Sequence, residues 1–189
     1  MNKYIVYTDG SRKGNPDKKE TIKGGWSAVI CDKSGKIIKE LYSGFVNTTS
    51  ARMEIMGVLE ALKYIKEPSE IEIISDSLYV VSSIGKRWID YYLKAPNGRA
   101  NIDLWKEIYP YLDYHKVNIS WTKGHSTDEM NNRADKLAQF AARCLNLPED
   151  EYIDNGEENW ESLVSESKTW GSDGSNTRQE NGKILYSLG

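Results

Sequence analysis

Asp9 is a carboxylate at the end of a short apolar segment. Residues 4–7 are β-branched or aromatic, as a buried strand prefers, and Gly10-Ser11 breaks that pattern. We therefore expect Asp9 at the end of a strand inside a sheet. An ionised Asp is costly to bury there unless a basic side chain or a bound metal lies beside it. The alternative is an Asp that begins a β-turn, the ordinary role of a lone Asp-Gly pair.

Three more acidic residues occupy comparable places. Asp76 directly follows the strand-like segment 70–75, Glu54 lies one turn into a helix with Ser50 as its predicted N-cap, and Asp135 lies one turn into the last helix. If the strands that end at Asp9 and Asp76 are neighbours, the two carboxylates lie side by side. Individually, Asp76 and Asp135 also suit helix starts, and Glu54 suits a solvated helix face. Together, the four would form a ligand set for hard divalent cations.

The elements that must position these residues follow from periodicity and breakers. Segments 36–46 and 26–31 predict two strands that form an antiparallel meander with the strand carrying Asp9. Segments 70–75 and 116–122 predict two further strands. Helices are expected over residues 50–65, from residue 77 onward, over 101–109 and over 130–145. This order predicts an α/β fold with a five-stranded mixed sheet and helices packed on it.

Four motifs contain the acidic residues: YTDGS, TSARMEI, ISDSLYVV and WTKGHSTDEMNNRADKLA. In this order and spacing they resemble the cellular type-one ribonuclease H family, over residues 3–146. The resemblance implies strand order 3-2-1-4-5 and an endoribonuclease that hydrolyses the RNA strand of RNA·DNA hybrids, giving 5′-phosphate and 3′-hydroxyl ends. Two alternatives stay open, because one fold hosts several functions. One is a non-catalytic hybrid-binding module, which would be expected to lack a carboxylate, and the other is a nuclease of this fold acting on another duplex.

The resemblance also implies a two-metal site. It assigns Asp9, Glu54, Asp76 and Asp135 to two Mg²⁺ ions, for which Mn²⁺ is expected to substitute. Asp9 bridges both ions in this assignment, Glu54 and Asp76 hold one, and Asp135 holds the other. Two such ions, roughly 3.5–4 Å apart, activate a water and stabilise the leaving oxygen. Without metal the carboxylates repel one another, so the pKa of at least one is expected to be raised.

His125 and Asn131 lie in the loop and helix that lead to Asp135. His125 matches the family's loop histidine, ten residues before Asp135, which implies a role in proton transfer or product release. The alternative is a solvated loop histidine. Asn131 matches an asparagine that supports the loop and cleft. His115 matches nothing in the family and is expected at the surface.

Substrate contacts are implied by the same resemblance. The residues expected to read 2′-hydroxyls across the minor groove, by which RNA is told from DNA, are Arg12, Gly14, Asn15, Ser50 and Ala51. Those expected at a DNA-strand phosphate and along the DNA channel are Asn47, Thr49, Asn101 and Trp88. The chain departs from its relatives by an insertion over residues 17–23 that carries three lysines, and by a short segment after Trp88 that is poor in basic residues.

Composition limits the remaining classes. With 189 residues, of which 39% are hydrophobic, the chain suits one good core. We expect a catalytic domain over residues 1–147 and an acidic extension over 148–189. No apolar run is long enough to span a bilayer and no signal-peptide pattern is present, so we expect a cytoplasmic monomer. Cys31 and Cys144 have no metal-ligand or disulfide spacing.

Charge is divided unevenly along the chain. Residues 1–145 contain 22 basic and 18 acidic residues, a net charge of +4, whereas residues 146–189 contain 3 and 10, a net charge of −7. The basic body is compatible with a polyanionic partner. The acidic extension is expected to be partly disordered or docked, either on a protein partner or on the body itself. Docking would be mildly autoinhibitory, with Trp160 or Trp170 as an apolar foothold; the alternative is a solvated tail.

Overall fold

In the computed structural model, strand β1 (Asn2–Lys13), which carries Asp9, lies at the centre of a mixed sheet. The structure describes residues 1–97, 99–124, 127–150, 177–180 and 183–187. The sheet continues through β2 (Lys23–Asp32), β3 (Ile37–Val46), β4 (Ser69–Ser75) and β5 (Lys116–Trp121). Its order, β3-β2-β1-β4-β5, confirms the prediction. The first three strands are antiparallel, and β4 runs parallel to both β1 and β5.

Two short strands from the C-terminal segment extend this sheet. Strand β7 (Lys183–Ser187) pairs antiparallel with β5, and β6 (Thr177–Glu180) pairs antiparallel with β7. The sheet therefore has seven strands in the order β3-β2-β1-β4-β5-β7-β6, two more than the sequence predicts. Pairing with β7 covers the backbone of β5, which would otherwise be an open edge.

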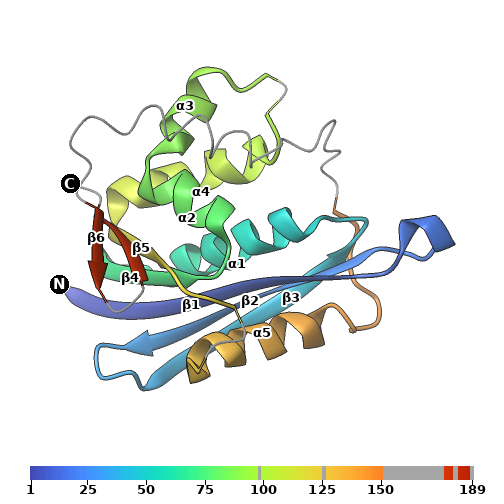
Figure 1. Ribbon diagram of the computed structural model, residues 1–189, viewed down its shortest axis with the longest axis horizontal. Helices are drawn as coiled ribbons and strands as arrows, with labels where there is room; N and C mark the ends of the chain where they lie inside the picture. Colours follow the sequence, from blue (N-terminus) through green and yellow to red (C-terminus); the bar gives the residue numbers. More distant parts are fainter. Residues whose placement is uncertain (98, 125–126, 151–176, 181–182, 188–189) are drawn as a thin grey trace.

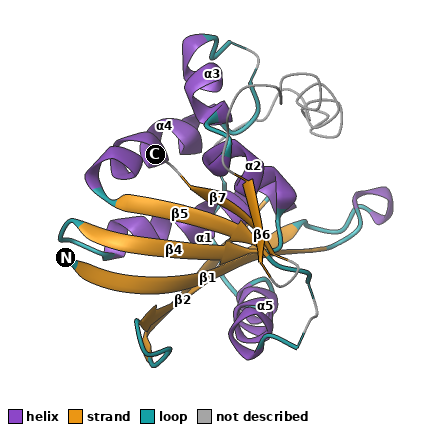
Figure 2. Cartoon of the chain, turned by 60° about the vertical axis from the view of Figure 1, so that its left-hand side comes forward, coloured by secondary structure: helices purple, strands orange, loops and turns teal. Residues whose placement is uncertain are grey.

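Helices cover both faces of the sheet (Figures 1 and 2). One face carries α1 (Ser50–Tyr64), α2 (Leu78–Gly85), α3 (Trp88–Lys94) and α4 (Ile102–Tyr114), and the other carries α5 (Glu129–Ala141). A short 3-10 helix, η1 (Pro16–Lys18), lies in the loop between β1 and β2. None of the helices in the described ranges is long and apolar enough to cross a bilayer.

Alternation along β2 divides the core into two layers. Ala28 and Ile30 face the larger cluster, which α1 and its neighbouring helices complete, whereas Val29 and Cys31 face a smaller cluster with Ala134 of α5. All these side chains are fully buried. The period-two pattern of the strand thus holds helices on opposite faces of the same backbone.

Two glycines let the helices approach the sheet closely. A β-carbon at Gly10 of β1 would lie 2.5 Å from the backbone nitrogen of Glu54 in α1. A β-carbon at Gly25 of β2 would lie 2.1 Å from the carbonyl oxygen of Ala138 in α5. Any larger residue would push α1 or α5 outward, together with the acidic residue that the helix carries.

Several local predictions were wrong. The N-cap of α1 is Thr49, whose side chain accepts from Arg52 N, and Ser50 is the first helical residue. Helix α4 continues through Pro110 to Tyr114. Helix α5 ends at Ala141 and begins at Glu129, which places Asp135 nearly two turns inside it.

His115 was also predicted wrongly as a surface residue. It is 3% exposed, and its ring packs against Tyr111 and Tyr114. Its Nδ1 accepts a hydrogen bond from the backbone nitrogen of Ser69. Burial lowers the pKa of His115, so it serves as a neutral core residue between α4 and β5.

Candidate active site

Asp9, Glu54 and Asp76 form a cluster in which one carboxylate oxygen from each residue lies within 4.8 Å of the others. The parallel register of β1 and β4 pairs Thr8 with Ser75, so the residues that follow, Asp9 and Asp76, emerge side by side. Glu54 reaches them from α1 because Gly10 allows that helix to touch β1. The predicted meeting of these three carboxylates is therefore present.

Burial and mutual repulsion raise the pKa values of two carboxylates in this cluster. Asp9 is 5% exposed, and burial, followed by the charge of Asp76, raises its pKa to about 8. Burial and then the charge of Asp9 also raise the pKa of Glu54 well above its ordinary value. The Oε2 atom of Glu54 is buried and has no hydrogen-bond partner among the described residues. A cation would satisfy this oxygen and relieve the repulsion, so the donor set fits a divalent metal.

Asp135 approaches the cluster from the other face of the sheet. Its carboxylate contributes to the raised pKa of Asp9, although it lies outside the three-residue cluster. Both of its oxygens accept from Gln139 Nε2, at 3.0 Å each. The sequence analysis missed Gln139. Its spacing of four residues from Asp135 on a helix was the available signal.

The loop that carries His125 approaches Asp76. His125 itself lies outside the described residues, so the structure does not test its predicted role. A β-carbon at the neighbouring Gly124 would lie 2.6 Å from Oδ2 of Asp76. Asn131 is 1% exposed in the first turn of α5, and its backbone nitrogen donates to the N-cap Asp128.

The residues predicted to read the minor groove are divided between two elements. Arg12 is exposed at the end of β1, and Gly14 follows with a φ of 101°. The side chain of Asn15 caps η1 by accepting from the backbone nitrogen of Asp17. Ser50 is exposed at the start of α1, whereas Ala51 packs against the core.

The residues predicted at the DNA strand have unequal access. The Nδ2 of Asn47 donates to Oε1 of Glu149 at 2.6 Å, in an exposed contact. Asn101 is 2% exposed, and its Nδ2 donates to the Tyr79 hydroxyl at 3.4 Å. Trp88 is partly buried at the start of α3, with Lys86 Nζ 5.4 Å from the ring centroid. The hydroxyl of Thr49 caps α1 by accepting from the backbone nitrogen of Arg52.

Arg52, two residues before Glu54, joins these parts and was also missed by the sequence analysis. Its guanidinium is 3% exposed and donates to both oxygens of Asp103 in α4, at 2.9 and 2.8 Å. It also donates to both oxygens of Asp150, at 2.6 and 2.9 Å. Arg52 therefore ties the starts of α1 and α4 to the first residues after Pro148.

The beginning of the acidic extension continues alongside β3. The backbone nitrogen of Val46 donates to Pro148 O at 2.8 Å, and Asp150 N donates to Val46 O at 3.0 Å. The hydroxyl of Thr48 adds a hydrogen bond to Asp150 at 2.7 Å. Thus Glu149 and Asp150 dock on the body beside the predicted phosphate site. Trp160 and Trp170, the predicted foothold, lie outside the described residues.

A family model for ribonuclease H matches residues 1–143 of the chain. The chain belongs to the ribonuclease H family. It is 38% identical over 146 residues to the ribonuclease H of Caldicellulosiruptor saccharolyticus, covering 74% of this chain and 95% of that protein. It is 40% identical over 152 residues to that of Syntrophomonas wolfei, covering 77% and 99%. With such relatives, the chain is an endoribonuclease.

Solved structures show the same fold. The ribonuclease H domain of PFV is 26% identical and superposes with a TM-score of 0.61, covering 75% of this chain and 95% of that domain. LC9-RNase H1 is 24% identical, with a TM-score of 0.64, and covers 89% of this chain and 85% of its own.

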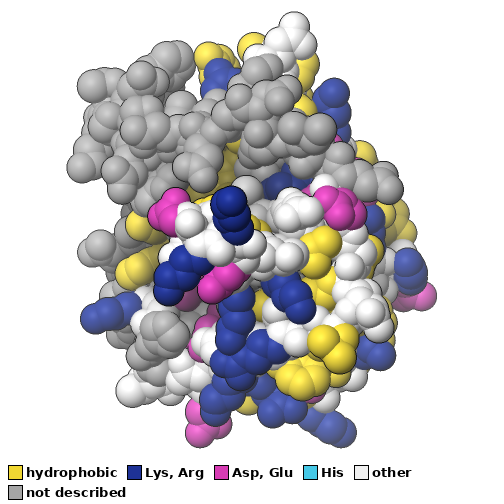
Figure 3. Space-filling view, turned by 90° about the vertical axis from the view of Figure 1, so that its right-hand side faces the viewer, with side chains coloured by type: hydrophobic (Ala, Val, Ile, Leu, Met, Phe, Trp, Pro, Cys, Tyr) yellow, Lys and Arg dark blue, Asp and Glu magenta, His cyan; other side chains and the backbone are white. Residues whose placement is uncertain are grey.

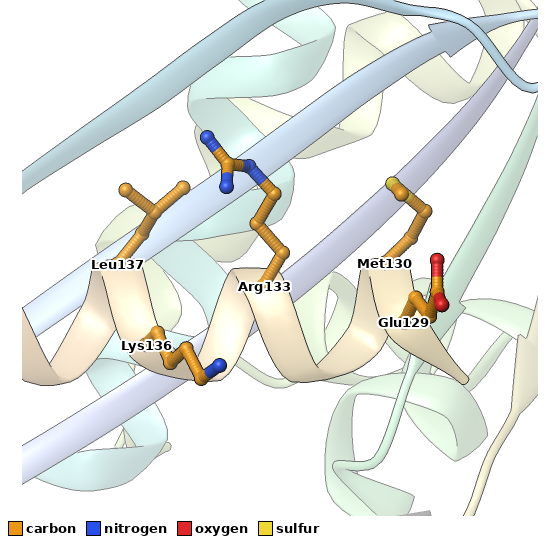
Figure 4. A pocket seen from close by; sticks show the side chains of 5 residues that line it. All are labelled: Glu129, Met130, Arg133, Lys136 and Leu137. Atoms are coloured by element: carbon orange, nitrogen blue, oxygen red, sulfur yellow. The ribbon is translucent and has the colours of Figure 1, made fainter. Parts of the chain in front are cut away.

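A separate pocket lies on α5, away from the acidic cluster of this ribonuclease H fold (Figure 4). It has a volume of about 320 Å³ and is lined by Glu129, Met130, Arg133, Lys136 and Leu137. Arg133 forms an ion pair with Glu40 of β3. None of the carboxylates assigned to metal lines this pocket, so it does not belong to the candidate active site.

Proposed function

We propose that this endoribonuclease hydrolyses the RNA strand of RNA·DNA hybrids with two bound divalent cations, Mg²⁺ or Mn²⁺. The observation that carries the proposal is the convergence of Asp9, Glu54 and Asp76 within 4.8 Å, beside a Glu54 oxygen that has no partner in the described part of the chain. Hard cations with carboxylate ligands are the standard means of phosphodiester hydrolysis. When bound, the two ions supply an activated water and stabilise the leaving 3′ oxygen.

The chain's own residues divide this task by position. Asp9 has an oxygen within 4.8 Å of Glu54 and Asp76, and the charge of Asp135 also raises its pKa, so Asp9 would be the carboxylate that both ions share. Gln139 donates to both oxygens of Asp135 and so orients its carboxylate. Such outer partners are important because they hold a ligand in the geometry that the metal needs.

His125 acts in proton transfer or product release in this proposal. The support is its sequence position beside Gly124, which approaches Asp76, together with the ability of an imidazole to gain and lose a proton near neutral pH. Asn131 is buried in the first turn of α5, where its backbone nitrogen donates to the N-cap Asp128, and we propose that it supports this loop and the cleft.

We propose that the enzyme contacts both the minor groove and the phosphate backbone of the hybrid. Arg12 is exposed near the end of β1, the strand that carries Asp9, and Ser50 is exposed at the start of α1, the helix that carries Glu54, so both can contact 2′-hydroxyls or phosphates of a bound hybrid. Asn47 holds Glu149 in this structure, so binding of a phosphate at its amide requires that contact to open. We propose that the enzyme acts as a monomer.

The test is to incubate the full chain and Mg²⁺ with a labelled RNA·DNA hybrid, single-stranded RNA, duplex RNA and duplex DNA, with Asp9→Asn as control. The expected result is cleavage of RNA in the hybrid alone, by the wild type alone. Tight hybrid binding without cleavage would establish a binding module instead. Equal cleavage of duplex RNA or DNA would establish a nuclease with a different substrate.

A further inference from the structure

The loop between β1 and β2 extends from the sheet as a basic hairpin, which we define as residues 12–23. Strands β1 and β2 pair as far as Lys13 and Lys23, and the residues between them leave the sheet (Figure 1). The hairpin contains five basic residues, Arg12, Lys13, Lys18, Lys19 and Lys23, against Asp17 and Glu20, a net charge of +3. Arg12, Lys18 and Lys19 are exposed.

The structure shows no ion pair for the cations of the basic hairpin among the residues that it describes. Within the described ranges, Arg12, Lys13, Lys18 and Lys19 form no ion pair. Glu20, the acidic residue nearest to them in the turn, accepts from the backbone nitrogen of Asn15 instead. The hairpin therefore presents a net positive charge whose cations are not held in ion pairs within the described ranges.

Around α3, by contrast, three basic side chains are already engaged. Arg87 pairs with Asp90 at 2.9 Å, Arg99 lies 4.7 Å from the ring centroid of Tyr91, and Lys86 lies over Trp88. These contacts hold the cations against the protein surface. Lys18 and Lys19 of the hairpin have no ion pair within the described ranges, and Figure 3 shows Lys and Arg side chains on the end of the molecule from which the hairpin extends.

The basic hairpin is also within reach of a bound duplex. Asp9 and Lys13 lie on the same strand, four residues apart, which is about 13 Å at the rise of a strand. A duplex carries one phosphate charge per roughly 1.7 Å of its axis. When one phosphodiester of a duplex lies at the acidic cluster, other phosphates of the same duplex are therefore as far from the cluster as the hairpin is.

We propose that the basic hairpin is a second contact surface for the hybrid, which binds backbone phosphates outside the catalytic centre through Lys18 and Lys19. The inference rests on the proposed function for the nature of the duplex. Binding of this kind is independent of sequence and falls steeply with salt, because it releases counterions. It would extend the footprint of the enzyme beyond the nucleotides that enter the acidic cluster.

The test compares Lys18→Gln/Lys19→Asn with a matched control, Lys33→Gln/Lys36→Gln. Asn is chosen at position 19 because that residue has a φ of 55°, which Asn tolerates. Lys33 and Lys36 are exposed in the turn at the opposite end of β2, so the control changes charge equally at a remote place. Both doubles are made in the Asp9→Asn background, and hybrid affinity is measured by fluorescence anisotropy across a KCl series.

The hairpin variant is expected to bind about 10-fold more weakly at low salt, and its plot of log K against log salt is expected to be less steep by about 1.4 to 1.8. The control is expected to stay within about twofold of its parent by the same counterion argument. A wild-type slope in the hairpin variant, or an equal loss in the control, would overturn the proposal.

Failure of this proposal is distinguishable from failure of the proposed function. The anisotropy experiment measures binding alone, and uses RNA·DNA hybrid and duplex DNA in separate titrations. A reduced slope for hybrid supports the hairpin surface, whether or not the wild type cleaves. The cleavage experiment described above tests the catalytic assignment separately. A wild-type salt slope in the anisotropy experiment would rule out the hairpin surface and would leave the catalytic assignment unaffected.

Discussion

Replacing Asp9 by Asn tests the electrostatics of the cluster separately from its chemistry. The amide is nearly isosteric, and its oxygen can still accept from Gly10 N, which lies 2.7 Å from Oδ1 of Asp9. What the substitution removes is a charge beside Asp76 and Glu54. We expect Asp9→Asn to abolish cleavage, and to make the metal-free protein more stable at neutral pH.

The magnitude follows from the raised pKa of Asp9, from 3.8 to about 8. Below pH 3.8 both the folded and the unfolded states are protonated, and the free energy of unfolding is unaffected. Between the two values the unfolded state loses its proton and the folded state keeps it, so stability falls as pH rises. The loss reaches at most about 6 kcal/mol above pH 8, with about 4 kcal/mol at pH 7 and about 2 kcal/mol at pH 5.

Urea unfolding in EDTA at pH 5, 7 and 8 measures this difference. The stabilisation of Asp9→Asn over wild type is expected to grow with pH over this range. Adding Mg²⁺ is expected to reduce this difference in the free energy of unfolding. The ion binds only the folded state, and it stabilises the wild type more than the variant, which lacks one carboxylate ligand. A variant less stable than wild type at every pH, or a gap that does not change with pH, would refute the reasoning.

Three other substitutions test neighbouring parts of the structure. Arg52→Met removes the guanidinium that donates to both oxygens of the buried Asp150 carboxylate, and is expected to cost about 3 to 5 kcal/mol in urea unfolding. The control Arg133→Met breaks an exposed pair and is expected to cost less than about 1 kcal/mol; equal costs would contradict this contrast. Glu149→Gln removes a charge from the Asn47 amide, and we expect KM for hybrid to fall about 2- to 5-fold at low salt and the effect to fade as salt rises. An unchanged KM at low ionic strength would assign Glu149 a structural role only. His125→Ala is expected to slow turnover about 10²- to 10⁴-fold, less than Asp9→Asn does, and an equal loss in kcat would instead make His125 a ligand or a structural residue.

The strand ends could be predicted from sequence because their signals are local. Asp9 and Asp76 each follow an apolar segment, and a parallel pair of strands places such ends together. Glu54 and Asp135 depend on how closely two helices approach the sheet. That approach is permitted by Gly10 and by the contact of α5 with Gly25, and the positions of these glycines are informative only once the packing is known.

The features that sequence reasoning missed depend on contacts between distant residues. Asn47 and Glu149 are 102 residues apart, and no periodicity connects them. Arg52 reads as an exposed helix residue until Asp103 and Asp150 close around it. His115 follows a helix that runs through a proline, and a boundary drawn before that proline left the histidine in a loop.

The central claim is that the carboxylate cluster cuts RNA in a hybrid only when it holds divalent cations. The most direct measurement is single-turnover cleavage of a hybrid with end-labelled RNA, titrated with Mg²⁺ after EDTA treatment, for the wild type and Asp76→Asn. We expect no cleavage without metal, saturable cleavage by the wild type with 5′-phosphate and 3′-hydroxyl ends, and none by the variant. Cleavage in EDTA, or wild-type rates from Asp76→Asn, would contradict it.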